Sequence, residues 1–119
     1  MIKEVAFVAI AVSDKERARK FYQETLELKP SMSAMDGNWT EYDLGFTTIG
    51  VGCHPAWQPS RDGTTIAFEV ENIDDAINKL KKRGVAFDME KTETPVCWMA
   101  QFRDPDGNKL VLHKRKAKE

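Results

Sequence analysis

An internal repeat is the feature that most restricts how this 119-residue chain can fold. When the sequence is moved along itself by 58 residues, Val12 falls on Val70 and Asp14 falls on Asn72. The matching segments, FVAIAVSD and TIAFEVEN, are each an apolar, β-favouring run that ends in residues suited to begin a helix. The sequence therefore predicts two copies of one structural unit, each opening with a strand and a helix.

The remainder of each copy indicates three further strands. The first helix is predicted to begin at Ser13, with Glu16 completing a capping box, and the second to begin at Asn72 and end at Gly84. The strand-like segments after the first helix are KPSMSAM, WTEYDL and FTTIGVG, and those after the second are VAFDMEK, VCWMAQFR and NKLVLHK. RDPDGN and, less regularly, MDGN are typical of tight hairpin turns. Each half of the chain should therefore be a βαβββ unit.

The length of the chain fits one domain. We expect residues 1–119 to form a single domain, with module one at 1–54, a connector at 55–63 and module two at 64–119. The connector is irregular because it contains two prolines, and it could cover a pocket or serve only as a linker.

Charge and hydropathy exclude several classes of partner. The 18 Lys and Arg residues nearly balance the 19 Asp and Glu residues, so nucleic acid is not an expected partner. The sequence contains no apolar run approaching the roughly 20 residues of a membrane-spanning helix and no signal-peptide pattern. We therefore expect a cytoplasmic protein with no membrane partner, in which Cys53 and Cys97 are free thiols.

Three stretches together resemble the vicinal oxygen chelate superfamily, which includes glyoxalase I, fosfomycin and bleomycin resistance proteins and extradiol dioxygenases. They are VAIAVSDKERARKFYQETLELKP, IAFEVENIDDAINKLKKRG and RDPDGNKLVLHK, and the resemblance extends over nearly the whole chain. It implies an α+β fold in which two βαβββ modules form a half-open mixed β-barrel around a pocket, with the helices outside. It also implies a homodimer, a common state in this superfamily.

The resemblance further implies where a metal ion would bind. Metal-dependent members hold a divalent ion through His and Glu side chains, which leave positions open for a substrate. The corresponding positions here are Phe7, Thr65 and Val111, and a fourth lies in FTTIGVG, which contains no His, Asp or Glu. Because these side chains are not useful metal ligands, we expect no metal cofactor.

The alternation of strand side chains predicts which residues line the pocket. Residues of the repeated strands that point away from the helices should face the hollow of the barrel. Two tryptophans, Trp57 and Trp98, are added to the predicted lining, because Trp is a common anchor of binding pockets. Core packing or a dimer interface is an equally good explanation for each. The predicted ligand pocket comprises Phe7, Ala9, Thr65, Ala67, Glu69, Val111, His113, Trp57 and Trp98.

Glu69 and His113 are the candidate catalytic residues within this set. Glu69 lies at a pocket-facing position of an otherwise apolar strand and could be a general base or a ligand anchor, or simply a surface carboxylate paired with a lysine. His113 could orient a ligand or bond a backbone carbonyl.

Two classes of function follow from these patterns. We favour a metal-free, small-molecule-binding homodimer of the superfamily. The alternative is a glyoxalase-like lyase or isomerase, or a dioxygenase, that uses an unrecognised metal site or metal-independent acid/base chemistry. A purely structural dimerisation module is a third interpretation, and the sequence alone does not decide whether the chain is an enzyme.

Overall fold

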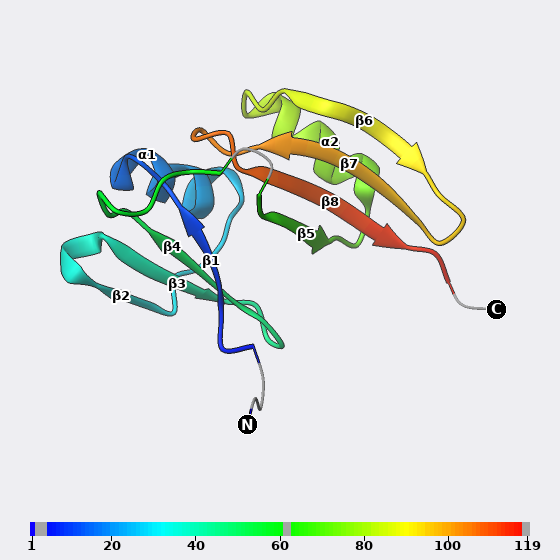
Figure 1. Ribbon diagram of the computed structural model, residues 1–119. Coiled ribbons are helices and arrows are strands. Elements are labelled where there is room, and N and C mark those ends of the chain that lie inside the picture. Colours follow the sequence, from blue (N-terminus) through cyan, green and yellow to red (C-terminus); the bar gives the residue numbers. More distant parts are fainter. Residues whose placement is uncertain (2–4, 61–62, 118–119) are drawn as a thin grey trace. The chain divides into compact units, whose positions relative to one another are not determined.

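A computed structural model describes residues 1, 5–60 and 63–117, and within them the chain forms two βαβββ units (Figure 1). The chain divides into two compact units, Met1–Ser60 and Arg61–Glu119, so the boundary between them lies inside the expected connector. The assignment of both units to one domain stays a prediction.

The first unit contains a four-stranded mixed sheet in the order β1-β4-β3-β2. Strand β1 is parallel to β4, and the other neighbours are antiparallel. The elements are β1 (Val8–Ala11), α1 (Lys15–Arg19), the π-helical turn η1 (Lys20–Thr25), β2 (Met32–Ala34), the 3₁₀ turn η2 (Met35–Gly37), β3 (Trp39–Asp43) and β4 (Thr48–Gly52).

The second unit repeats this topology with the strand order β5-β8-β7-β6. Its elements are β5 (Thr65–Glu69), α2 (Ile73–Lys82), β6 (Phe87–Glu93), β7 (Cys97–Arg103) and β8 (Lys109–Arg115). The repeat and the α+β fold class are thereby confirmed, with the strands in two separate four-stranded sheets. None of the helices within the described residues is both long and apolar enough to cross a membrane.

The two helices begin at equivalent positions of the repeat. The Asp14 carboxylate accepts the backbone N–H of Arg17 at 3.0 Å, and the Asn72 side chain accepts the backbone N–H of Asp75 at the same distance. The prediction that the first helix begins at Ser13 was therefore wrong by one residue. Ser13 instead accepts a hydrogen bond from the side chain of Arg17 at 3.1 Å.

One face of the first sheet packs against α1 and η1. The rings of Tyr22 and Tyr42 are stacked there, with their centroids 6.1 Å apart. In η1 the backbone N–H of Leu26 bonds to the carbonyl of Phe21, five residues earlier, at 2.9 Å. This wider turn accompanies the burial of two consecutive aromatic residues. The buried apolar residues of this unit include Ile10, Val12, Ala18, Phe21, Tyr22, Tyr42, Ile49 and Val51.

The core of the second unit lies between α2 and one face of its sheet. It contains Ile73, Ile77, Leu80, Ala100, Phe102, Leu110 and Leu112. The RDPDGN hairpin joins β7 to β8 as predicted. The Asp104 carboxylate accepts the N–H groups of Asp106 and Asn108 at 2.9 Å each, and Gly107 has a positive φ of 86°. Cys97 is buried, and both it and Cys53 are free thiols.

Candidate ligand-binding site

The face of the first sheet opposite α1 carries aromatic side chains instead of a covering helix. Trp39 pairs with Gly52, and Ala9 lies beside Gly50. Successive residues of a strand point to opposite faces, so these four lie on the face away from the buried Tyr42. Ala9 is therefore on the helix-free face, as the alternation predicted.

Trp39 packs against two glycines of β4, Gly50 and Gly52. A Cβ atom added at Gly50 would overlap the six-membered ring of Trp39, so the ring and any larger residue cannot occupy this place together. The indole N–H of Trp39 donates to the Glu41 carboxylate at 2.8 Å. These two constraints hold a buried tryptophan in one orientation on the sheet.

Trp57 is returned to the same face by a turn in the connector. Its backbone N–H donates to the carbonyl of His54 at 2.9 Å, and the Ala56 N–H donates to His54 Nδ1 at 3.0 Å. A Cβ atom added at Gly52 would overlap the Trp57 ring. Trp57 was predicted from the sequence to be a pocket residue, and the structure places it over the helix-free face.

The rings form a continuous series that we call the aromatic row: Phe7, Trp39, Trp57 and His54. Phe7 meets Trp39 edge-to-face with centroids 5.2 Å apart, and Trp39 meets Trp57 in the same way at 5.8 Å. The centroids of His54 and Trp57 are 5.9 Å apart. Phe7 is 45% exposed and Trp57 is 46% exposed, so the row presents fixed aromatic surface that a ligand can cover.

Trp39 was not among the residues predicted to line the pocket. The available signal was GVG in β4, because two glycines separated by one residue lie on the same face of a strand and leave a flat surface. The pairing of Gly52 with Trp39 is a tertiary fact that one sequence does not supply.

The helix-free face of the second unit brings together five predicted pocket residues. Strands β5 and β8 are parallel, and Thr65 pairs with Lys109. The next pairs on the same face are Ala67 with Val111 and Glu69 with His113, so the other four predicted residues share this face. Val111 is buried, whereas Thr65 and Ala67 are exposed.

Glu69 and His113 are in direct contact. Oε1 of Glu69 lies 2.6 Å from Nδ1 of His113, and Oε2 accepts the backbone N–H of Arg115 at 2.9 Å. Desolvation by itself raises the pKa of Glu69, but the two hydrogen bonds and the positive charges of His113 and Arg115 outweigh it, so the pKa lies below its usual value. Among the residues that the structure describes, the carboxylate is therefore paired with a histidine, and no lysine is bonded to it.

Trp98 lies on the other face of the second sheet. It alternates with Met99, which pairs with His113, and its own partner on β8 is Lys114. The Nζ atoms of Lys116 and Lys91 lie 4.9 and 5.9 Å from the centroid of the Trp98 ring. The expected association of Trp98 with Glu69 and His113 is thus not observed, because a shift of one residue along a strand reverses the face of a side chain.

The side chains at the implied metal positions do not fit the family's divalent ion. Phe7, Thr65 and Val111 offer a phenyl ring, a hydroxyl and an isopropyl group in place of imidazole and carboxylate. Among the residues that the structure describes, no three or more His, Cys, Asp or Glu side chains form a group that could hold a metal ion.

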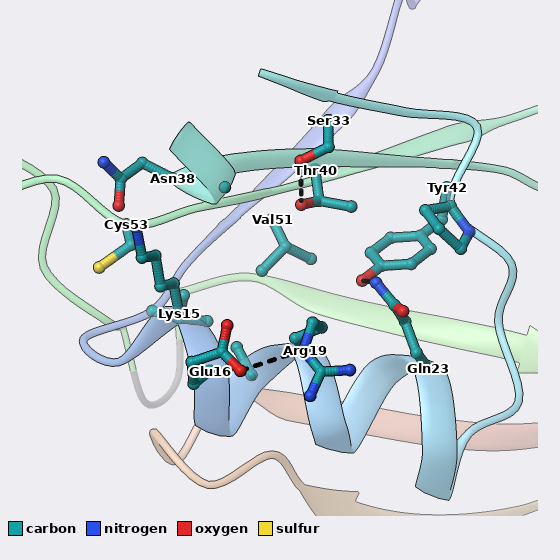
Figure 2. Close-up of a pocket in the computed structure, with 14 residues that line it drawn as sticks. Lys15, Glu16, Arg19, Gln23, Ser33, Asn38, Thr40, Tyr42, Val51 and Cys53 are labelled. Carbon is teal, nitrogen blue, oxygen red and sulfur yellow. Dashed lines mark hydrogen bonds and ion pairs between the residues drawn. The ribbon is translucent and has the colours of Figure 1, made fainter. Parts of the chain in front are cut away.

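A hollow lies on the helix side of the first sheet, between α1, η1 and the strands (Figure 2). Gln23 donates to the Tyr42 hydroxyl at 3.2 Å, and the Ser33 and Thr40 hydroxyls are 3.4 Å apart. Burial raises the pKa of Tyr42, although the hydrogen bond from Gln23 and the charge of Arg19 act in the opposite direction. The Gln23 bond joins η1 to β3, so the polar groups of this hollow already have a structural role. We therefore place the candidate ligand site on the aromatic row.

Two βαβββ units, each with one helix-covered and one helix-free sheet face, define the class of paired-module α+β proteins. The family model described as the Glyoxalase/Bleomycin resistance protein/Dioxygenase superfamily matches residues 4–112. The chain belongs to this superfamily, and the resemblance found in the sequence is confirmed.

Known proteins are similar to this chain over almost its whole length. The uncharacterized protein YetH of Bacillus subtilis is 29% identical over 118 residues, which are 94% of this chain and 98% of YetH. TnmS3, an antibiotic binding protein from Streptomyces sp. CB03234, is 26% identical with a TM-score of 0.81, covering 97% of this chain and 98% of its own. A member of the superfamily from Sphaerobacter thermophilus is 28% identical with a TM-score of 0.78, covering 95% and 98%.

Proposed function

We propose that the protein binds a small, at least partly apolar molecule against the aromatic row and does so without a metal ion. The observation that carries this proposal is the edge-to-face series of Phe7, Trp39 and Trp57 on the helix-free face of the first sheet. Phe7 and Trp57 are nearly half exposed, so their mutual packing leaves contiguous aromatic surface that a ligand can cover.

The row is suited to binding because its geometry is set before a ligand arrives. Gly50 and Gly52 provide the flat surface beneath the indoles, and Glu41 fixes the Trp39 N–H. A planar ligand would bury apolar ring surface, at about 25 cal/mol per Å², with little loss of side-chain freedom. The description of TnmS3 as an antibiotic binding protein supports a small-molecule ligand.

The remaining elements of the proposal concern cofactor and assembly. Metal-free binding follows from Phe7, Thr65 and Val111, which lack the ligand chemistry of the family's metal-dependent members. We further propose that the protein is cytoplasmic and that it forms a homodimer, the latter as the family resemblance implies.

Titration with a panel of fused-ring aromatic antibiotics and bleomycin, followed by tryptophan fluorescence and calorimetry, tests the binding function. A ligand of the row should bind Trp57→Ala at least about tenfold more weakly, because a buried aromatic contact is worth more than about 1 kcal/mol. Trp98→Phe is the matched control, since Trp98 lies on the helix side of the second sheet. Equal loss of affinity in both variants, or no loss in Trp57→Ala for any ligand that binds, would contradict the proposal.

The contact between Glu69 and His113 favours a second candidate, an acid/base enzyme of the same superfamily. The two functions are separated by mass spectrometry of each bound ligand after incubation with the protein. A binding protein returns the ligand unchanged. Conversion by the native protein that is lost in His113→Gln would instead establish the enzyme.

A further inference from the structure

The contact between Glu69 and His113 determines where the imidazole proton lies. Both oxygens of the Glu69 carboxylate are engaged, one with His113 Nδ1 at 2.6 Å and the other with the Arg115 N–H at 2.9 Å. An ionised carboxylate can only accept hydrogen bonds, so Nδ1 of His113 must be the donor. A glutamate of ordinary pKa is already ionised at neutral pH, so this assignment does not depend on the charge of His113.

The second ring nitrogen of His113 is left as an acceptor. In a neutral imidazole only one nitrogen carries hydrogen, so a proton on Nδ1 leaves a lone pair on Nε2. Within the described part of the chain no group hydrogen-bonds to Nε2, and the His113 side chain is 24% exposed. The acceptor is thus reachable from outside.

The neighbours of His113 on the helix-free face are mostly apolar. Register places Met99 directly beside it on β7, and Val111 shares its face on β8. Ala67 lies on the same face of β5, opposite Val111. Two charged residues are also part of this surrounding, Glu69 and Arg115, and the backbone N–H of Arg115 is bound to Glu69. A ligand beside the His113 ring would therefore meet the apolar side chains of Met99, Val111 and Ala67 together with the Nε2 acceptor, with Glu69 and Arg115 close by.

We propose that His113 Nε2 accepts a hydrogen bond from an acidic hydroxyl, phenolic or enolic, on an otherwise apolar ligand. Glu69 is the positioning residue, because it holds the ring in the tautomer that leaves Nε2 unprotonated. The ligand part rests on small-molecule binding as the proposed function, here at a face of the second unit and not at the aromatic row. The tautomer is a property of the ligand-free protein and is measured independently.

The other histidine supplies an internal control. The sequence contains two histidines, and His54 Nδ1 accepts the N–H of Ala56 at 3.0 Å. Neutral His54 must therefore carry its proton on Nε2, the reverse of His113. One spectrum of one protein should display both tautomers.

Long-range ¹H–¹⁵N NMR of the imidazole rings, at a pH where both are neutral, tests the tautomers. His54→Gln assigns the two sets of resonances. We expect His113 with the proton on Nδ1 and His54 with the proton on Nε2. Glu69→Ala should move His113 toward the Nε2–H form and leave His54 unchanged, whereas an Nε2–H His113 in the native protein would overturn the proposal.

Titration with 4-fluorophenol and 4-fluoroanisole, followed by ¹⁹F NMR, tests the acceptor. The anisole has the same ring but no donor, so the phenol should bind about five- to tenfold more tightly. His113→Phe should remove this preference and keep an apolar surface. Equal binding of both probes by the native protein would overturn the acceptor role. Ligand binding at the aromatic row is tested independently, by the Trp57→Ala titration.

Discussion

At the scale of single residues, the position of the Trp39 ring depends on the glycines of β4. Gly50→Ala places a methyl group where the Trp39 ring lies, so the ring must move. We expect this substitution to lower the free energy of unfolding by about 1–3 kcal/mol, measured by urea denaturation.

The same substitution in a Trp39→Ala background is the control. Without the indole the added methyl meets no ring, and alanine is favoured over glycine in a strand by roughly 0.5–1 kcal/mol. Gly50→Ala should then be neutral or stabilising. An equal destabilisation in both backgrounds would show that the ring is not the cause.

Glu69 makes a pH-dependent contribution to stability whose sign follows from its lowered pKa. Folding favours the ionised carboxylate, so the contribution is complete above the pKa of the unfolded chain, 4.5, and is lost as the pH falls through the lower folded value. Because the side chain is 37% exposed, we expect no more than about 1 kcal/mol.

Urea denaturation of the native protein and of Glu69→Gln, between about pH 6 and pH 3, measures this contribution. The stability advantage of the native protein should decrease toward the acidic end, since glutamine does not titrate. Parallel stability curves across this range would rule out the predicted linkage.

The helices illustrate how much of an element its sequence specifies. Asp14 and Asn72 cap equivalent helices at equivalent repeat positions. The predicted start at Ser13 was one residue early because both side chains can accept a hydrogen bond, and only the extended backbone of Asp14, with φ −141° and ψ 108°, identifies the cap. We did not predict the π-helical turn of η1, because no sequence pattern indicated it.

Removal of each cap should destabilise the protein by about 1 kcal/mol. Asp14→Ala and Asn72→Ala each leave a backbone N–H of the first turn without its partner, and chemical denaturation measures the loss. Ser13→Ala is the matched control, because that hydroxyl bonds a side chain at the surface. A loss in Ser13→Ala as large as that in Asp14→Ala would assign the cap to the serine.

At the scale of the whole molecule, the metal content separates the proposed function from the metal-dependent members of the superfamily. Protein purified without chelators should contain no stoichiometric metal by elemental analysis. Calorimetric titration with nickel, zinc, manganese and iron(II) should show no tight site, because Phe7, Thr65 and Val111 lack suitable donor atoms. One tightly held ion per chain would overturn metal-free binding and favour the enzyme.

The βαβββ topology of both units was predictable because hydrophobic alternation, turn residues and the 58-residue repeat are local patterns. Alternation also placed Ala9 away from the helix, and it put Glu69 and His113 on one face, since each strand has only two faces. Trp98 shows the limit of this reasoning, because its face depends on where β7 begins relative to its neighbours.

The amino-acid order thus determined the family, the repeat and the main strands and helices, because each strand and helix is specified by residues near one another in the chain. Only the tertiary structure decided that Trp39 covers Gly50 and Gly52, that Trp57 returns to the same face, and that the carboxylate of Glu69 meets the ring of His113, 44 residues away. The physical reason is that such contacts depend on strand register and on the path of a connecting turn, which are set when distant strands pair and not by local preference.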